Sequence, residues 1–224
     1  MYIIPNLIEE FASSFSYSST VVSSVITGGN TELNLGNTYH ARTGTIVDID
    51  GTSAEVVSFD SVLNNIEVVG EFNSPLLVTV PNPFFFHGTP YKTNTHISYL
   101  DAGQKFPMIY LYEIIEEELQ NEESSGLYEI AELRLFFLDN ANFAEWTTDQ
   151  HYSEVITGQR KAAEEFKNKL NVYRLFDRPS FIKILNHANF GQFFDLKGHL
   201  QSIFNEYTSG VEMRLKLPIR KCCN

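Results

Sequence analysis

Two β-strand sequences joined by an acidic stretch constrain the fold of this chain more than any other feature. The first runs from Phe106 to Ile115 and the second from Leu127 to Leu138, and both are rich in β-branched and aromatic residues. The second alternates apolar and charged side chains only roughly, which is typical of a central, mostly buried strand. The stretch between them predicts a loop in water, because it carries five glutamates: Glu116, Glu117, Glu118, Glu122 and Glu123. The sequence therefore predicts a sheet with a long hairpin arm.

The sequence before this sheet predicts one helix and then a series of short strands. Apolar residues recur at helical spacing from Leu7 to Phe15, so we expect an amphipathic helix there, followed by a strand at 20–26. From about residue 30 to residue 91 the pattern is all-β. Strands at 44–49 and 54–59 flank Asp50 and Gly51, a strong hairpin signal, and further strands at 66–69 and 76–80 favour a small barrel or sandwich.

The sequence after the sheet predicts one long helix and mixed shorter elements. Thr147 and Gln150 have capping-box spacing, and an apolar stripe continues the helix from 148 to about 171. The segment 179–185 fits a strand or a short helix, and 200–204 fits a short helix. Residues 211–217 alternate strictly between one apolar and one charged face, so we expect a half-buried strand that could lie at an edge of the sheet.

These elements predict an α+β fold with an antiparallel or mixed sheet packed by helices. The core comprises residues 1–29 and 92–224, and residues 30–91 form an inserted small β subdomain. That insertion ends in a Pro-rich arm containing Phe84, Phe85 and Phe86. Two interpretations stay open for these aromatics: a loop packed over the domain junction, or an arm that docks on a neighbouring subunit.

The charge of the chain excludes some partners. With 16 Lys and Arg against 28 Asp and Glu, the net charge of −12 argues against a protein that grips nucleic acid, although an acidic wall can surround DNA that slides past. No apolar run approaches the roughly 20 residues of a membrane span, and no signal peptide is expected. The adjacent Cys222 and Cys223 are expected to be thiols in a reducing compartment.

A small basic group near the C-terminus contrasts with the acidic chain: Arg214, Lys216, Arg220 and Lys221. Its simplest role is solubility. On an edge strand it could also pair with an acidic neighbouring surface, and the glutamates at 116–118, 122 and 123 are a natural complement in a head-to-tail arrangement. These glutamates could instead gather a divalent cation, but a solvated tip is favoured.

The strongest catalytic pattern is Asp48-Ile49-Asp50-Gly51-Thr52, which looks like the first motif of haloacid-dehalogenase-type phosphatases. That chemistry needs a parallel α/β sheet and a later acidic pair for Mg²⁺, whereas another β segment follows here. A phosphatase using Asp48 and Asp50 is therefore a minor alternative. The histidines show no zinc-ligand spacing, and no phosphate-binding or nucleophile motif is present.

Three segments resemble a known family. Residues 105–111, preceded by 99–101, are similar to its strand of the form (K)(Y/F)P followed by apolar residues. Residues 133–138 and 144–152 resemble its strand and following helix start, and 196–198, 204–206, 209–211 and 217–219 resemble its closing strand. The family is that of the neck and tail-completion (tail-terminator-like) proteins of tailed bacteriophages, particularly crAss-like and related phages of Bacteroides-type hosts. The likeness covers residues 99–219, and residues 30–91 have no counterpart in it.

The resemblance implies a subunit that assembles as a ring, commonly of about six or twelve copies, between portal and tail. It implies no enzymatic activity and no cofactor. Expected partners are further copies of the chain, the portal and adjacent neck or tail rings, and DNA would be enclosed rather than specifically bound. The expected location is the virion, after synthesis in the host cytoplasm. A third alternative is a host- or glycan-binding module at 30–91, but no clustered exposed Trp or Tyr favours it.

Overall fold

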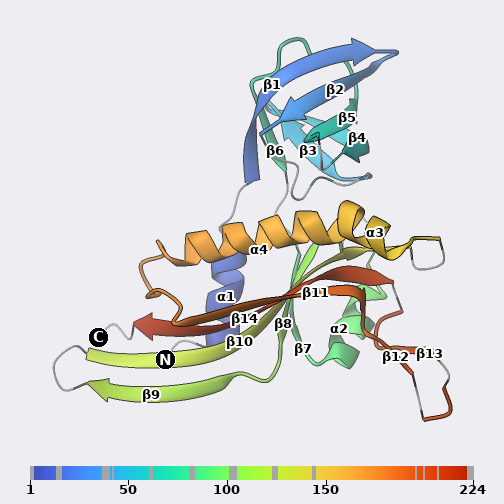
Figure 1. The fold of residues 1–224 in the computed structure, drawn as a ribbon. Coiled ribbons are helices and arrows are strands. Elements are labelled where there is room, and N and C mark those ends of the chain that lie inside the picture. Colours follow the sequence, from blue (N-terminus) through green and yellow to red (C-terminus); the bar gives the residue numbers. More distant parts are fainter. Residues whose placement is uncertain are drawn as a thin grey trace.

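The protein has an α+β fold in which a six-stranded sheet is packed by helices and a closed β-barrel forms a second unit (Figure 1). The computed structural model describes residues 3–13, 17–36, 41, 43–60, 63–80, 84–100, 105–122, 126–142, 145–194, 196–198, 200–205 and 207–220. Within this part of the chain, no helix is long and apolar enough to cross a membrane. The predicted fold class is confirmed.

The large sheet is built on its two longest strands. β10 (Gly126–Asn140) and β14 (Thr208–Arg220) pair antiparallel from Tyr128 to Asn140 of β10, which covers the whole of β14. β11 (Phe181–Phe190) pairs with the other side of β14, while β8 (Met108–Tyr112) and β9 (Glu116–Glu122) share the remaining side of β10. The fifth strand of the path, β7 (Phe84–Gly88), runs parallel to β8.

Helices cover one face of this sheet. α1 (Ile4–Ser13) and α4 (Thr157–Leu170) bury their apolar sides against it, and the rings of Phe11 and Phe166 meet edge to face at 5.0 Å. α4 continues from α3 (Thr148–His151) through a π-helical turn, η2 (Tyr152–Ile156). The predicted capping box is confirmed, since Thr147 and Gln150 exchange both of its hydrogen bonds.

The opposite face is covered at one end only. α2 (Pro90–Ile97) and the hairpin of β12 (Gln192–Phe194) and β13 (Leu200–Ser202) lie over that end. A second apolar cluster fills the space beneath them, with Tyr110 and Phe136 stacked at 5.5 Å. The other end of this face remains uncovered by any described helix or strand.

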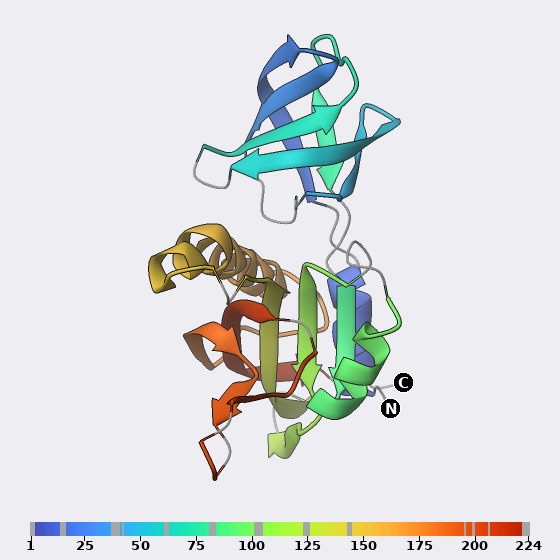
Figure 2. The ribbon, with the colours of Figure 1, turned by 90° about the vertical axis from the view of Figure 1, so that its right-hand side faces the viewer.

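The barrel contains six strands in the closed order β1-β2-β5-β4-β3-β6. In both views the barrel lies on the side of α4 that faces away from the large sheet (Figure 1 and Figure 2). The hairpin predicted at Asp50 and Gly51 joins two of its strands, and both residues have the positive φ angles, 49° and 89°, that a tight hairpin turn requires. The strands are β1 (Tyr17–Thr27), β2 (Asn30–Leu35), β3 (Ile46–Ile49), β4 (Thr52–Asp60), β5 (Asn65–Val69) and β6 (Leu77–Val80).

The boundaries of the β subdomain differ from the prediction at both ends. β1 was expected in the core, but it pairs with β2 and β6 and so closes the barrel. Phe84–Phe86 were expected in an arm of the insertion, but they lie in β7 of the large sheet. Alternate side chains of a strand point to opposite faces, so Phe85 packs against one apolar cluster while Phe84 and Phe86 pack against the other.

Three local predictions were wrong because tertiary pairing overrode local preference. The stretch Glu116–Glu122, expected to be a loop, is strand β9, held by seven paired positions of β10. Residues 211–217, expected near an edge, lie in β14 between two other strands. The segment expected as a short helix at 200–204 contains strand β13 instead.

Candidate functional site

The uncovered end of the sheet holds a hollow of about 570 Å³ between β8, β10, β11 and β14. Its lining combines an aromatic and aliphatic floor with charged side chains of both signs. The lining residues are Tyr112, Ile114, Glu116, Glu132, Leu133, Arg134, Phe181, Lys183, Arg214, Leu215 and Lys216. Four of these residues are cationic, although the chain as a whole is acidic.

Strand register places three cations of this hollow in one row. Arg134 of β10 lies directly opposite Arg214 of β14, which lies opposite Lys183 of β11. Like charges at directly opposed positions destabilise a sheet. The row therefore needs nearby anions to offset this repulsion.

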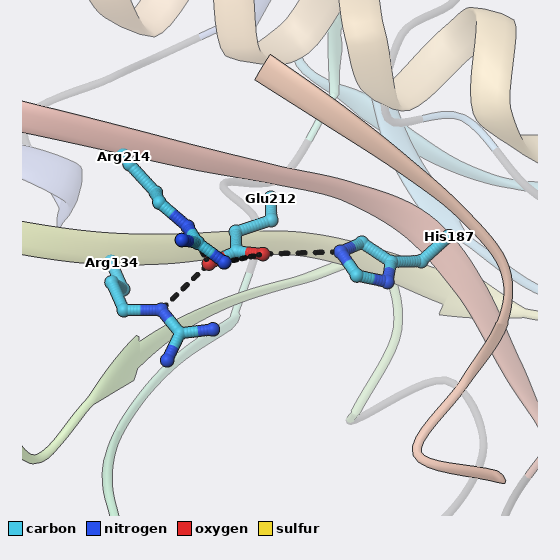
Figure 3. A network of polar contacts seen from close by, with 4 residues as sticks. All are labelled: Arg134, His187, Glu212 and Arg214. Carbon is cyan, nitrogen blue, oxygen red and sulfur yellow. Dashed lines mark hydrogen bonds and ion pairs between the residues drawn. The ribbon is translucent and has the colours of Figure 1, made fainter. Parts of the chain in front are cut away.

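One buried carboxylate supplies most of that compensation. Glu212, on β14, is 1% exposed and accepts hydrogen bonds from Arg134 Nε at 2.6 Å and from Arg214 Nε at 2.6 Å (Figure 3). Arg214 Nη2 and His187 Nε2 each lie 3.2 Å from its other oxygen. Both carboxylate oxygens are thus used, and the two guanidinium groups are held side by side.

The pKa of Glu212 is well below its ordinary value despite its burial. Burial by itself raises the pKa, because it penalises the charged form, but hydrogen bonds from His187, Arg214 and Arg134 together outweigh that effect. The carboxylate is therefore ionised. Its hydrogen bonds position the two arginines.

Aromatic rings further fix Arg134. Its guanidinium carbon lies 5.1 Å from the ring centre of Tyr112 and 5.5 Å from that of Phe136. The Nη groups of Arg134 lie on the far side of the guanidinium from Glu212 (Figure 3). Because the side chains of Arg134 and Arg214 are 41% and 43% exposed, both can still bind an anion from solution. Such paired guanidinium groups suit carboxylate and phosphate oxygens.

The predicted basic residues form their ion pairs inside the chain. Lys216 pairs with Glu132 on the neighbouring strand, and this carboxylate raises the pKa of Lys216. Arg220 pairs with Asp177. Arg214 belongs to the Glu212 network. Lys221 lies outside the described residues, so its predicted role stays a prediction.

The predicted acidic residues fall on β9. Glu116 lines the hollow, and the side chains of Glu117 and Glu118 are exposed on the same strand. Glu122 ends β9, and Glu123 lies outside the described residues. The third predicted interface group is different, since Phe86 is buried and Phe84 and Phe85 are partly buried within the sheet's own core. The structure places these phenylalanines in strand β7 and not in an arm, and their interface role stays a prediction.

Sequence reasoning missed Arg134, Lys183, Glu212 and His187. The strict alternation of residues 211–217 did place Glu212, Arg214 and Lys216 on one face. The other cations lie on different strands, so only the register between β10, β14 and β11 brings them together. Knowledge of that register would have been needed to predict this cluster.

The aspartates of the phosphatase alternative have structural roles in the barrel. Asp48 Oδ1 accepts a hydrogen bond from Gly51 N at 3.0 Å. Asp50 accepts from Leu76 N at 2.8 Å and from Leu77 N at 3.0 Å. They lie at an antiparallel hairpin, not in the parallel sheet that this chemistry needs, and the described residues contain no cluster suited to a metal ion.

A buried histidine and serine also lack a catalytic arrangement. His151 Nδ1 lies 2.9 Å from Ser209 Oγ, but the serine hydroxyl donates to the carbonyl oxygen of Ala188. The imidazole must therefore donate to Ser209, so it cannot accept the proton that a nucleophilic serine loses. Ser209 is fully buried, and the pair ties β14 to the helix start.

No protein-family model matches this chain, and comparison with curated proteins and with solved structures gives no match. The phage-family resemblance therefore remains a prediction from three sequence segments.

Proposed function

We propose that this chain is a structural virion protein that forms an oligomeric ring in the neck or tail of a tailed phage. The ring, of about six or twelve copies, connects the portal to the tail and lets DNA pass. Beyond the sequence resemblance, one observation carries the proposal. A single chain presents an exposed acidic edge strand and, on the same sheet, a cationic hollow.

The edge strand suits contacts between subunits. Among the described strands β9 pairs with β10 alone, so its other side presents backbone groups to a neighbour. Its glutamates discourage pairing with arbitrary strands but favour a cationic surface. Together with the hollow they form two different, complementary patches, which is the condition for head-to-tail contacts and closed rings.

The charge of the chain suits a channel that DNA crosses. A net charge of −12 repels phosphate, so a ring of such subunits would hold DNA weakly and let it move. The arrangement around Glu212 also supports an assembly role, because its carboxylate holds two exposed arginines in place for a partner.

Native mass spectrometry and negative-stain electron microscopy test this proposal. The purified chain, alone and mixed with the portal protein of the same phage, is expected to form closed rings of one copy number. Discrete rings that join the portal would support a connector role. A chain that stays monomeric in every condition, including with portal, would refute it.

A further inference from the structure

The cationic row in the hollow carries more positive charge than the chain itself neutralises. Glu212 compensates Arg134 and Arg214, but Lys183 has no ion-pair partner among the residues that the structure describes. Lys183 is exposed and lies directly opposite Arg214. An anion placed over this row would relieve the remaining repulsion.

The chain's own carboxylates at the hollow act elsewhere. Glu132 is engaged by Lys216, and the charges of Glu116 and Glu118 also act on Lys216. Lys216 lies one row away from the guanidinium pair, opposite Glu132 and Phe181. The hollow is thus divided into a neutralised end beside β9 and a cationic end at Arg134, Arg214 and Lys183.

A partner with closely spaced carboxylates has the charge that suits this row. Nucleic acid is a poor candidate because the whole chain has a net charge of −12. The edge strand β9 has the required chemistry, because the exposed side chains of Glu116 and Glu118 are two positions apart and so share one face of the strand. β9 and β10 form a hairpin in which β9 lies at the edge of the sheet (Figure 1), so a neighbouring copy can offer this strand.

We propose that the cationic end of the hollow binds the acidic β9 strand of a second copy of this chain. Carboxylates of that strand bind the exposed guanidinium groups of Arg134 and Arg214 and the ammonium group of Lys183. Glu212 is a positioning residue, since it holds the two arginines ready before the partner arrives. This inference rests on the proposed function and assigns the contact between subunits of the ring.

A charge-reversal cycle within one chain tests the contact. Lys183→Glu and Glu118→Lys change exposed residues on the two proposed surfaces, and neither residue is among the described hydrogen-bond partners of Glu212. Each single variant is expected to weaken self-association about tenfold or more, because like charges then face each other. The double variant is expected to recover to within about threefold of the original chain, since opposite charges meet again in every contact. Sedimentation velocity over a concentration series measures these constants.

A matched control and a salt series complete the test. Lys92→Glu makes the same charge change on α2, outside the hollow, and is expected to leave self-association unchanged. Added salt is expected to weaken association of the original chain more than that of Lys183→Glu. Circular dichroism confirms that each variant is folded.

The outcomes separate this inference from the proposed function. The proposed contact would be overturned if Lys183→Glu formed rings as well as the original chain does, or if the double variant associated no more strongly than either single variant. Neither result would contradict the proposed ring. A chain that never self-associates would overturn both. Loss in each single variant with recovery in the double variant supports the contact.

Discussion

Replacing Glu212, the buried carboxylate that holds two arginines of the hollow, is the most direct perturbation of this structure. Glu212→Gln keeps the shape of the side chain but removes the charge that separates Arg134 from Arg214. Removing one partner of a buried ion pair costs roughly 3–5 kcal/mol, because the remaining charges lose their compensation. The side chains of both arginines are about two-fifths exposed, so water can solvate them when the carboxylate charge is removed. The expected loss of stability therefore lies at the lower end of this range. We expect a loss of about 3 kcal/mol in the free energy of unfolding.

Urea unfolding followed by tryptophan fluorescence measures this loss. The single tryptophan, Trp146, precedes α3 at the large sheet, so its signal reports on this unit and not on the barrel. Glu132→Gln is the matched control, since it breaks an ion pair on the same face whose partners are both exposed, worth about 1 kcal/mol or less. A loss for Glu212→Gln below about 1 kcal/mol, or equal to that of the control, would refute the proposed positioning of the arginines.

The difference in stability between the original chain and Glu212→Gln is expected to depend on pH. Because the folded-state pKa of Glu212 is lowered, its stabilisation is fully present above the ordinary value of 4.5 and is lost as the pH falls toward the lowered pKa. The stability difference between the original chain and Glu212→Gln is therefore expected to shrink below pH 4.5. Urea unfolding repeated at several acidic pH values measures it, and a difference that grows on acidification would contradict the assignment.

Three further substitutions test the surrounding fold. Gly210→Ala places a Cβ atom 2.0 Å from the carbonyl oxygen of Phe137, so we expect a loss of at least about 3 kcal/mol in urea unfolding; a smaller loss would mean that β14 can shift. Asp50→Ala removes two hydrogen bonds from backbone amides, so we expect the barrel to lose about 1–3 kcal/mol of stability. Faster hydrogen exchange at the Leu77 amide measures this loss, and Asp50→Asn is expected to lose less. Thr147→Ala removes the helix cap and is expected to cost about 1 kcal/mol by thermal unfolding, and an unchanged midpoint would exclude a role for the cap.

Local signals in the sequence were sufficient for several elements. The capping box at Thr147 and Gln150 and the turn at Asp50 and Gly51 formed as predicted, because each depends on hydrogen bonds and backbone angles within four residues. The long helix followed from its apolar stripe. The α+β class followed from the order of these elements.

Local signals failed where a strand is held by its neighbours. Glutamate-rich β9 has poor intrinsic strand preference, yet β10 presents a complete row of backbone partners that holds it in the sheet. In the sequence alone, Phe84–Phe86 look like an exposed apolar arm. In the structure they pair with β8, and each ring packs against one of the two apolar clusters of the sheet. Propensity describes an isolated segment, whereas these segments are stabilised by contacts distant in sequence.

By itself the sequence determined the acidic charge of the chain, its main helices, its hairpin turns and the alternation that puts Glu212, Arg214 and Lys216 on one strand face. Only the tertiary structure decided that Arg134 and Lys183 lie in the same row as Arg214. The reason is strand register, because a shift by one residue would move either cation to the helix-covered face. Register is set by the packing of whole strands, which no short segment encodes.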